Sequence, residues 1–195
     1  GLEEGLLIHN IGLSEGEKEV LKTFGFLSEK PMIIVANVDE AQLTSGDYAT
    51  KRDIIDYSKE RNVPFIEISA QSELEINTLD EEDKALFMEE LGITDPGIDK
   101  LAQTAYDYLG LISFLTAGED EVRAWPIKKN TPAKKAAGKI HSDIEKGFIR
   151  AEVIAFKDLE ELGSVAKVKE KGLARLEGKE YIVQDGDIIN FRFNV

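Results

Sequence analysis

The sequence predicts an α/β unit followed by an α+β unit. An apolar run over residues 32–36 stops at Asn37, and a second run, residues 64–68, follows about thirty residues later. A helical pattern lies between the two runs, and this order is typical of a parallel α/β crossover. From Leu111 onward the pattern changes to strands that flank one helix, which indicates a second unit with a mixed sheet.

The N-terminal part contains a helix start signal. Ser14 and Glu17 have the spacing of a capping box, in which Ser14 caps the helix and Glu17 reaches back to it. Apolar residues then recur at helical spacing, so we expect an amphipathic helix of about three turns. These residues are Val20, Leu21, Phe24 and Leu27.

Three further helices are predicted in the first unit. Residues 47–61 have a helical pattern that stops at Asn62. Four consecutive acids, residues 80–83, place negative charge at the positive end of a second helix. Apolar spacing over residues 98–109 marks a third helix, which Gly110 ends.

The second unit is predicted to have two strands, a helix and further strands. Thr131 and Pro132 have the pattern of a cap followed by a first-turn proline, so a helix should begin there and run toward His141. The Lys-rich segment 163–177 is expected to be a loop or a short helix. Strands are expected at residues 111–116, 121–127, 148–156, 181–183 and 188–193, with turns at 117–120 and 185–186. This order wraps one helix in a mixed sheet, which is a ubiquitin-like β-grasp arrangement.

The composition, with 195 residues of which 42% are hydrophobic, suits a soluble globular protein of one or two domains. The chain has no cysteine, which excludes disulfides and a catalytic Cys and makes a reducing cytoplasm the default compartment. No apolar run reaches the roughly 18–20 residues of a membrane span, so no membrane partner is expected. His9 and His141 lie far apart without a ligand-spaced partner, and neither a catalytic site nor a metal site is predicted.

The net charge of −14 is unevenly distributed. Residues 1–115 carry 9 Lys and Arg against 24 Asp and Glu, a net −15. Residues 116–195 carry 15 against 14, a net +1. The C-terminal part is therefore much less repulsive to a polyanion than the whole-chain charge indicates, and the change in charge supports a domain boundary.

The end of the first apolar strand is a candidate nucleobase site. Open α/β sheets bind ligands at the carboxyl ends of their strands, where Asn37 and Glu40 stand here. No G-x-x-x-x-G-K-[ST] motif precedes them, so the phosphate-binding end of a nucleotide site is missing from the sequence. The simpler alternative is that Asn37 only ends a strand and Glu40 only begins a helix.

Five stretches of the sequence together match a known pattern: Val35-Ala36-Asn37-Val38-Asp39-Glu40, Thr116-Ala117-Gly118 with residues 121–125, residues 136–143 running into 145–151, residues 181–187 and residues 191–195. On these stretches the chain resembles the C-terminal half of the Obg-like ATPases, the YchF group of the translation-factor GTPase superclass. In that family a P-loop nucleotide-binding G domain is followed by a TGS domain, a β-grasp module also found in threonyl-tRNA synthetases. The resemblance therefore implies the end of a G domain at residues 1–110 and a TGS domain at residues 111–195.

The resemblance also implies a ribosome-associated protein that binds and hydrolyses ATP with Mg²⁺. The Walker A loop, the switch regions and the magnesium ligands of the family have no counterpart in this sequence, so the chain alone should not hydrolyse ATP. The resemblance further implies that Asn37, Val38 and Glu40 read the base, with the backbone N–H groups of Ser69 and Ala70 in its plane. Guanine-specific relatives have Lys and Asp where this chain has Val38 and Glu40, so selectivity should be for adenine or relaxed.

Lysines on the predicted helix of the second unit are candidates for RNA or ribosome contact. Lys134, Lys135 and Lys139 cluster there, and phosphates would be their natural partner. The alternative is that they are ordinary solvated lysines interleaved with acids. His141 could contact an RNA end, although capping the helix C-terminus is the more common local role.

Two wider alternatives are compatible with the sequence. The chain could be a stand-alone TGS adaptor that binds RNA or protein and never binds nucleotide. If it is instead part of a larger sheet, the two parallel strands leave an edge and an apolar face uncovered, and self-association is expected.

Overall fold

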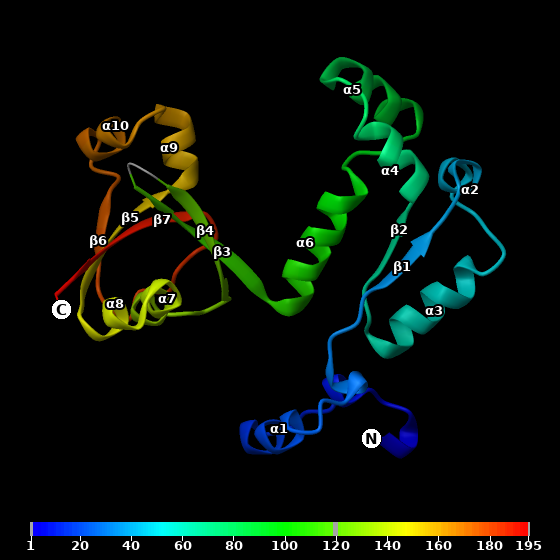
Figure 1. The fold of residues 1–195 in the computed structure, drawn as a ribbon, viewed down its shortest axis with the longest axis horizontal. Helices are drawn as coiled ribbons and strands as arrows, with labels where there is room; N and C mark the ends of the chain where they lie inside the picture. The colour runs from blue at the N-terminus through cyan, green and yellow to red at the C-terminus, as the bar shows by residue number, and fades with distance from the viewer. Residues whose placement is uncertain (1, 119–120, 195) are drawn as a thin grey trace. The chain divides into compact units, whose positions relative to one another are not determined.

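The structure is a computed structural model, and it describes residues 2–118 and 121–194. The chain divides into two compact units, Gly1–Tyr108 and Leu109–Val195, which are described separately (Figure 1). The predicted turn at 117–120 falls partly on residues 119–120, which lie outside the described residues.

Two parallel strands form the sheet of the first unit. Strand β1, Ile34–Asn37, pairs in parallel with β2, Phe65–Ile68, and the register runs from Ile34 opposite Phe65 to Asn37 opposite Ile68. The predicted parallel crossover is confirmed. The parallel register places the carboxyl ends of the two strands side by side, and the loops that follow them begin at the same edge.

The connection between the strands contains two helices where the sequence predicted one. Helix α2 spans Glu40–Ser45 and α3 spans Lys51–Arg61. The prediction of one helix over 47–61 was wrong at its start, since α3 begins at Lys51. Gly46 adopts a left-handed conformation that ends α2, and residues 47–50 connect the two helices. Asn62, at φ 50°, ends α3 as predicted.

The first unit contains three further α-helices after β2. They are α4, Ala70–Ile76, α5, Glu81–Glu90, and α6, Gly97–Leu109. The Asp80 carboxylate accepts a hydrogen bond from the backbone of Asp83 at 3.0 Å, so the acid cluster caps α5. Gly110 has a φ of +61° and follows the last residue of α6, as predicted.

The N-terminal segment holds helix α1, Glu15–Lys22, and short 3-10 turns at Leu2–Glu4, Ile8–Asn10 and Leu27–Glu29. The predicted capping box of Ser14 and Glu17 is confirmed. The predicted helix is present but shorter than the three turns expected, since α1 ends at Lys22, and Val20, Phe24 and Leu27 are 64%, 66% and 83% exposed. Phe24 instead stacks on Phe26, with 5.6 Å between ring centroids.

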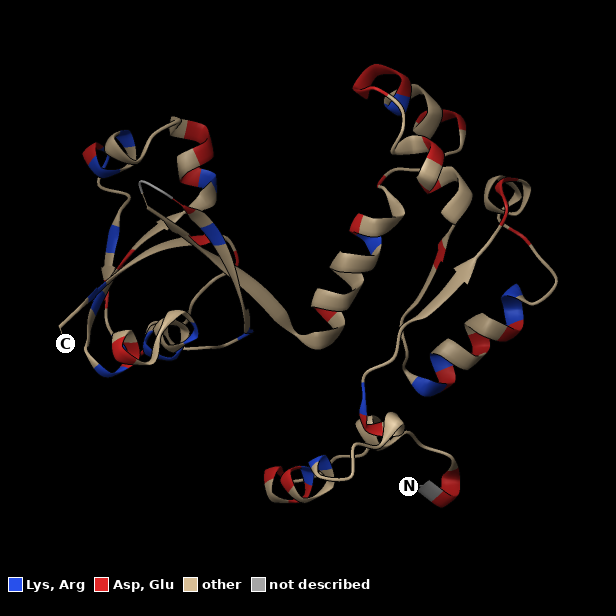
Figure 2. Ribbon diagram, viewed as in Figure 1, with Lys and Arg blue, Asp and Glu red and all other residues tan. Residues whose placement is uncertain are grey.

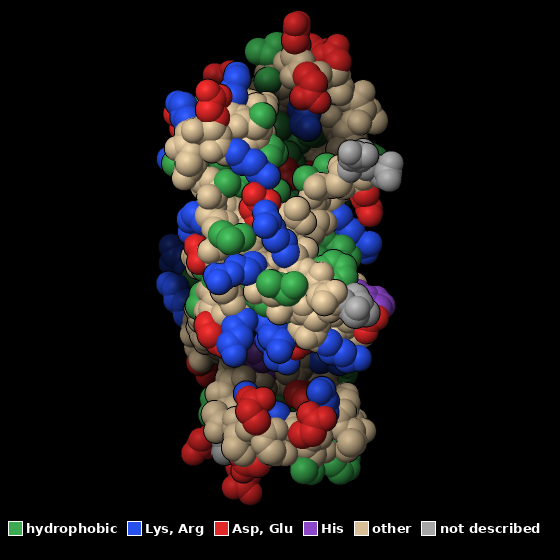
Figure 3. Space-filling view, turned by 90° about the vertical axis from the view of Figure 1, so that its left-hand side faces the viewer, with side chains coloured by type: hydrophobic (Ala, Val, Ile, Leu, Met, Phe, Trp, Pro, Cys, Tyr) green, Lys and Arg blue, Asp and Glu red, His purple; other side chains and the backbone are tan. Residues whose placement is uncertain are grey.

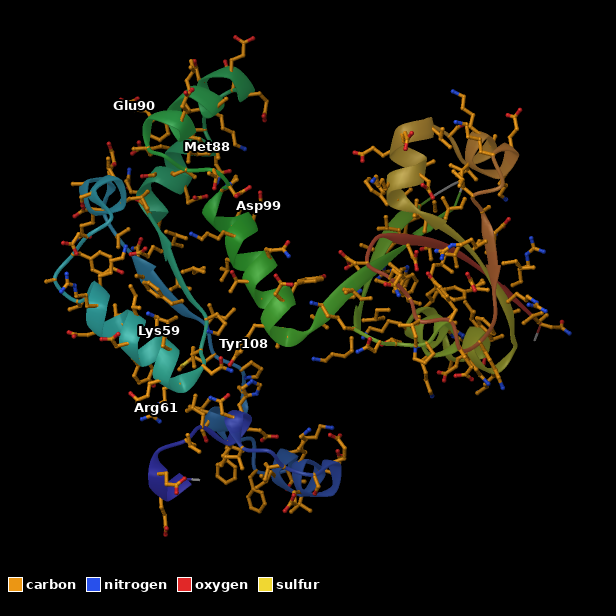
Figure 4. The ribbon with its side chains drawn as sticks, turned by 180° about the vertical axis from the view of Figure 1, so that it is seen from behind. Lys59, Arg61, Met88, Glu90, Asp99 and Tyr108 are labelled. Carbon is orange, nitrogen blue, oxygen red and sulfur yellow. The ribbon has the colours of Figure 1, made fainter. Side chains whose placement is uncertain are left out.

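The segment before α1 is held to the ends of α3 and α6, where Figure 4 labels Arg61 and Tyr108. The side-chain amide of Asn10 donates to the Arg61 carbonyl. The His9 ring lies edge-on to Tyr108, with 5.5 Å between centroids. These contacts fix the start of the chain against the same end of the first unit.

The second unit is a five-stranded mixed sheet in the order β4-β3-β7-β5-β6. The β3–β7 pair is parallel and the other pairs are antiparallel. The strands are β3, Leu111–Ala117, β4, Val122–Lys128, β5, Phe148–Ala155, β6, Arg175–Glu177, and β7, Asp187–Phe193. The helices are α7, Ala133–Ile140, α8, Ser142–Lys146, α9, Phe156–Leu162, and α10, Val165–Glu170.

Both faces of this sheet carry helices. Ala133, Ala136 and Ala137 of α7 are fully buried against Phe114 and Val153 of the sheet, and such small side chains let the helix backbone approach closely. Trp125 and Phe148 pack against this main core. A smaller cluster on the opposite face joins Ile154 and Ile188 to Val168 of α10.

Two local predictions in the second unit were wrong. Thr131 does not cap α7, because its hydroxyl donates to the Lys128 carbonyl, and Pro132 takes the cap position instead of the first turn. The first helical N–H, that of Ala133, donates to the Tyr181 carbonyl at 2.7 Å and needs no side-chain cap. Residues 181–183 form one isolated bridge, between Pro132 and Ile182, and not a strand.

Charge is distributed differently along the two units (Figure 2). Acidic residues cluster on α5, and Lys and Arg residues lie on α7, α10 and β6. Within the described residues, no helix is long and apolar enough to span a bilayer.

Candidate functional site

The first candidate site is the pair of loops at the carboxyl ends of β1 and β2. Asn37 is the last residue of β1 and is exposed, while Val38 is only 7% exposed. The Val38 N–H donates to the Ile68 carbonyl at 2.9 Å, which continues the parallel pairing one step beyond the strand. Val38 therefore points into the fold and does not offer a surface for a base to pack on.

The side chain of Asn37 connects the two loops. Its Oδ1 accepts a 3.0 Å hydrogen bond from the backbone N–H of Ala70, the first residue of α4. Ser69 is 2% exposed, and its hydroxyl accepts from the Ser72 N–H at 3.3 Å and from the Ser72 hydroxyl at 2.9 Å. Ser69 thus caps α4 and presents Ala70 to Asn37.

The first turn of α2 holds the acid of the motif. Asp39 caps α2, since its carboxylate accepts from the Gln42 N–H at 2.8 Å and its own N–H donates to Gln42 Oε1 at 3.1 Å. Glu40 is the first residue of the helix and is exposed. Among the described residues, the Glu40 carboxylate has no hydrogen-bond or ion-pair partner, so it is available to a ligand.

The acceptor and the donor of the Asn37 amide have different roles in this structure. Oδ1 is engaged with Ala70, and the two Nδ2 protons are left to donate outward. Ala70 was expected to offer its N–H to a base, but in the structure that N–H is already donated to Asn37. A cavity of about 120 Å³ in this unit is lined by Leu43, Ser69 and Glu73, and not by Asn37, Val38 or Glu40. The motif residues therefore form an open surface at the strand ends.

The second candidate site is the Lys-rich helix α7. Lys134, Lys135 and Lys139 are exposed. Lys135 Nζ lies 2.7 Å from Glu145 Oε1 of α8, so one of the three positive charges already has a carboxylate partner. In the part of the chain that the structure describes, the ammonium groups of Lys134 and Lys139 have no partner.

His141 caps a helix, but at the opposite end from the one expected. It follows the last residue of α7 in an extended conformation and precedes α8, and its Nδ1 accepts a 3.3 Å hydrogen bond from the Asp143 N–H. The imidazole therefore satisfies the start of α8 and does not stabilise the end of α7. The sequence gives the reason, since a tight connection leaves His141 as the last residue before Ser142 begins a new helix.

No metal centre is evident in residues 2–118 and 121–194, where no three His, Asp or Glu side chains are placed to hold an ion.

Comparison with known proteins extends these observations. The family model YchF-GTPase_C, described as "Protein of unknown function (DUF933)", matches residues 111–194. The Ribosome-binding ATPase YchF of Bacillus subtilis (strain 168) is 46% identical over 188 residues, which are 95% of this chain and 51% of that protein. The protein of the same name from Escherichia coli O157:H7 is 42% identical over 195 residues, 100% of this chain and 53% of that protein.

Solved structures give the same result. The Schizosaccharomyces pombe YchF GTPase superposes with a TM-score of 0.81 at 30% identity, over 97% of this chain and 50% of that chain. A GTP binding protein from Pyrococcus horikoshii OT3 has a TM-score of 0.59 at 18% identity, over 99% and 62% of the two chains, which is a likeness of fold alone.

The fold defines an α/β protein with a parallel strand pair and a second, mixed-sheet unit. The chain belongs to the YchF family and matches the C-terminal half of its members. It spans about half the length of the curated relatives that it matches.

Proposed function

We propose that this chain is the C-terminal half of a ribosome-associated ATP-binding P-loop protein of the cytoplasm. In this proposal the first unit carries the nucleobase loop of a G domain, and the second unit is a TGS β-grasp module that contacts RNA. The two curated relatives reported above are named as ribosome-binding ATPases, which supports the assignment.

The sheet order supports the β-grasp assignment. Numbered within the second unit, the strands lie in the order 2-1-5-3-4, with the first and last strands parallel in the centre and α7 on one face. A β-grasp module encloses one main helix in a mixed sheet of this kind.

The Asn37–Ala70 hydrogen bond is the observation that carries the nucleotide proposal. It aligns the ends of β1 and β2. Because Oδ1 of the Asn37 amide accepts the Ala70 N–H, Nδ2 on the other side of the amide is left to donate to a ligand. That group can donate to a ring nitrogen of adenine. The carboxylate of Glu40 stands one methylene further from its backbone than an Asp carboxylate would, so it does not reproduce the bidentate contact that selects guanine.

The chain's residues fit the base but not the triphosphate of ATP. Asn37 and Glu40 offer the donor and acceptor groups that a base edge needs. The printed sequence has no Walker A motif to surround phosphates or to hold Mg²⁺, which in P-loop proteins neutralises charge on the phosphates. We therefore expect the chain alone to show no ATP turnover above a buffer control.

A titration of the 195-residue chain with adenosine and guanosine tests base recognition. In backbone-amide NMR spectra, adenosine at a few millimolar should shift Asn37, Val38 and Ala70, with smaller shifts from guanosine. The variant Asn37→Asp keeps an acceptor for the Ala70 N–H and removes the donor to the base, so it should fold normally and lose the shifts. If about 10 mM adenosine moves no resonance near Asn37, the alternative of an adaptor without a nucleotide role is favoured.

Ribosome contact through α7 is tested by reversing its charges. Replacing Lys134, Lys135 and Lys139 with Glu should reduce co-sedimentation of the chain with ribosomes and flatten its dependence on salt, by about one unit of slope per lost phosphate contact. Unchanged co-sedimentation over a salt series would leave the lysines as ordinary solvated side chains.

Self-association is proposed for the first unit. Val35 of β1 is 40% exposed, so apolar surface of the two-stranded sheet is uncovered, and Phe24 of the N-terminal segment is 66% exposed. We expect the weight-average mass to rise with concentration in sedimentation equilibrium. A constant monomer mass up to high concentration would contradict this.

A further inference from the structure

A β-bulge at the start of β5 places two neighbouring side chains on the same face of the second sheet. Phe148 lies opposite Phe193, and Arg150 lies opposite Arg192, so Ile149 and Arg150 together face one residue of β7. Phe148 and Ala151 both belong to the main core although they are three positions apart, which strict alternation would not allow. The extra residue lets both point inward and leaves Ile149 and Arg150 directed outward.

The bulge brings two arginines together. Arg150 and Arg192 are directly opposite on adjacent antiparallel strands, where Cβ atoms are about 4.5–5.5 Å apart. Arg150 is exposed, and among the described residues no carboxylate is within ion-pair distance of its guanidinium. Arg192 is 58% exposed, and its Nη2 lies 3.7 Å from Glu152 Oε2.

One carboxylate, Glu152, pairs with Arg192 and with a further cation. Glu152 also accepts the ammonium of Lys169, with its Oε1 3.0 Å from Lys169 Nζ. Lys169 and Arg192 therefore share the Glu152 carboxylate on the outer face of β5 and β7, next to Arg150. We name Arg150, Arg192 and Lys169 the arginine face.

Fold stability does not explain the arginine face. Like charges placed directly opposite across two strands destabilise a sheet, and the 16% exposed Glu152 carboxylate has Lys169 at 3.0 Å as a closer partner than Arg192 at 3.7 Å. An anion bound between the guanidinium groups would turn the repulsion into attraction. Guanidinium forks bind phosphate oxygens in pairs, which distinguishes arginine from lysine as a phosphate ligand.

The surroundings suit an extended partner. Figure 3 shows a face of the second unit on which Lys and Arg side chains gather with hydrophobic side chains between them. Ile149 and Leu176 are 57% and 53% exposed, and Leu176 pairs with Glu152 on this outer face. Apolar side chains among cations can pack against sugars and bases while the cations hold phosphates.

We propose that the arginine face binds the phosphate backbone of RNA, and that it is a stronger RNA contact than the lysines of α7. This inference rests on the proposed RNA contact of the second unit and names the surface that makes it. A series of phosphates matches cations set along a strand pair, whereas an acidic protein would need a carboxylate cluster of matching geometry.

Binding of the 195-residue chain to single-stranded oligouridylate of about 20 nucleotides tests the inference, measured by fluorescence anisotropy over a KCl series. Arg150→Gln with Arg192→Gln should weaken binding about tenfold near 100 mM KCl and lower the log–log salt slope by roughly 1.4. The matched control is Arg52→Gln with Lys59→Gln on α3, two exposed cations in the first unit. This control removes the same charge and should change affinity less than twofold.

Two further variants separate phosphate recognition from general charge and from folding. Arg150→Lys keeps the charge and loses the guanidinium fork, so affinity should fall a few-fold with the salt slope unchanged. The double Gln variant should melt at the same or a higher temperature, because it removes the repulsion. A lower melting temperature would make the pair structural and overturn the inference.

The remaining outcomes distinguish this inference from the function on which it rests. If Lys134→Gln, Lys135→Gln and Lys139→Gln together weaken RNA binding and the arginine variant does not, the RNA contact stands and the arginine face is refuted. If neither set weakens measurable binding, both fail. If polyglutamate displaces the chain from RNA at equal charge concentration, the face is a general acid-binding surface and the RNA assignment is overturned.

Discussion

The hydroxyl of Tyr181 donates a 2.7 Å hydrogen bond to Oδ2 of Asp187, a carboxylate that is only 2% exposed. The same oxygen accepts the N–H of Gln184 at 2.8 Å, and Arg175 Nη2 lies 3.5 Å from Oδ1. A buried carboxylate is tolerated when such donors surround it. This network fixes the loop before β7 to β6, and so it sets the position of the central strand of the second unit.

Removing one donor from this network should destabilise the protein. Tyr181→Phe leaves the buried Asp187 carboxylate without its shortest hydrogen bond, and the expected loss is about 2 kcal/mol in the free energy of unfolding. Urea denaturation of the variant and the wild type measures it. Tyr57→Phe is the control, because Tyr57 is 41% exposed and should cost little. Equal losses for the two variants would show that Asp187 does not depend on Tyr181.

The same network predicts an alkaline loss of stability. Burial, and then the hydrogen bond to Asp187, raise the pKa of Tyr181 to about 12 from 10.0. The neutral phenol is therefore favoured in the folded state, and its contribution is complete below pH 10 and is lost as the pH rises through about 12.

Two single variants show which tyrosine causes the loss of stability at alkaline pH. Burial, and then Glu67, also raise the pKa of Tyr48 to about 12. Tyr181→Phe and Tyr48→Phe should therefore each remove part of the dependence of unfolding free energy on pH between about 10 and 12. If the curve for Tyr181→Phe has the same slope as the wild type, Tyr181 does not titrate with folding.

Asn37 should contribute to stability through its acceptor alone. Asn37→Ala removes the partner of the Ala70 N–H, and the expected loss is about 1 kcal/mol because the site is exposed to water. Asn37→Asp keeps an acceptor and should equal the wild type within about 0.5 kcal/mol. Thermal unfolding followed by circular dichroism compares the two. A larger loss for the Asp variant than for the Ala variant would contradict the hydrogen-bond assignment.

Local rules in the sequence were sufficient for some features and not for others. The capping box at Ser14 and the stop at Asn62 depend on a few neighbouring residues, and both were confirmed. The Asn37–Ala70 hydrogen bond joins two loops that meet only when β1 and β2 pair. The parallel strand pair was predicted, but which atom of the Asn37 amide would be occupied depends on the register.

Other local predictions failed because groups that are distant in the sequence supply the hydrogen-bond or pairing partners. Thr131 has the pattern of a cap, yet the Ala133 N–H finds a carbonyl from Tyr181 and leaves the Thr131 hydroxyl to Lys128. Arg150 and Arg192 are placed opposite each other by antiparallel pairing and a bulge, so no local spacing in the sequence indicates that they are neighbours. The lysines of α7 can be recognised as a cluster in the sequence because they are close together in the chain. The residues of the arginine face are far apart in the chain and become neighbours only in the folded sheet.

Gly147 should be required for the bulge that forms this face. A Cβ at position 147 would overlap the backbone carbonyl of Asn194, and that backbone is held in place because the Asn194 N–H donates to the Gly147 carbonyl at 2.9 Å. Since a backbone held by this hydrogen bond moves aside less readily than a flexible side chain, Gly147→Ala should lower the free energy of unfolding by about 1–3 kcal/mol.

Gly178→Ala is the matched control, because a Cβ there meets nothing within 4 Å. Denaturant unfolding gives both stabilities, and amide exchange at Arg150 and Arg192 reports on the pairing of β5 with β7. Gly147→Ala should speed exchange at these two positions more than elsewhere in the second unit, since the overlap forces the strand ends apart. Exchange rates and stability equal to those of the Gly178 variant would show that the strand ends can separate without cost, and that the bulge is not fixed by this close approach.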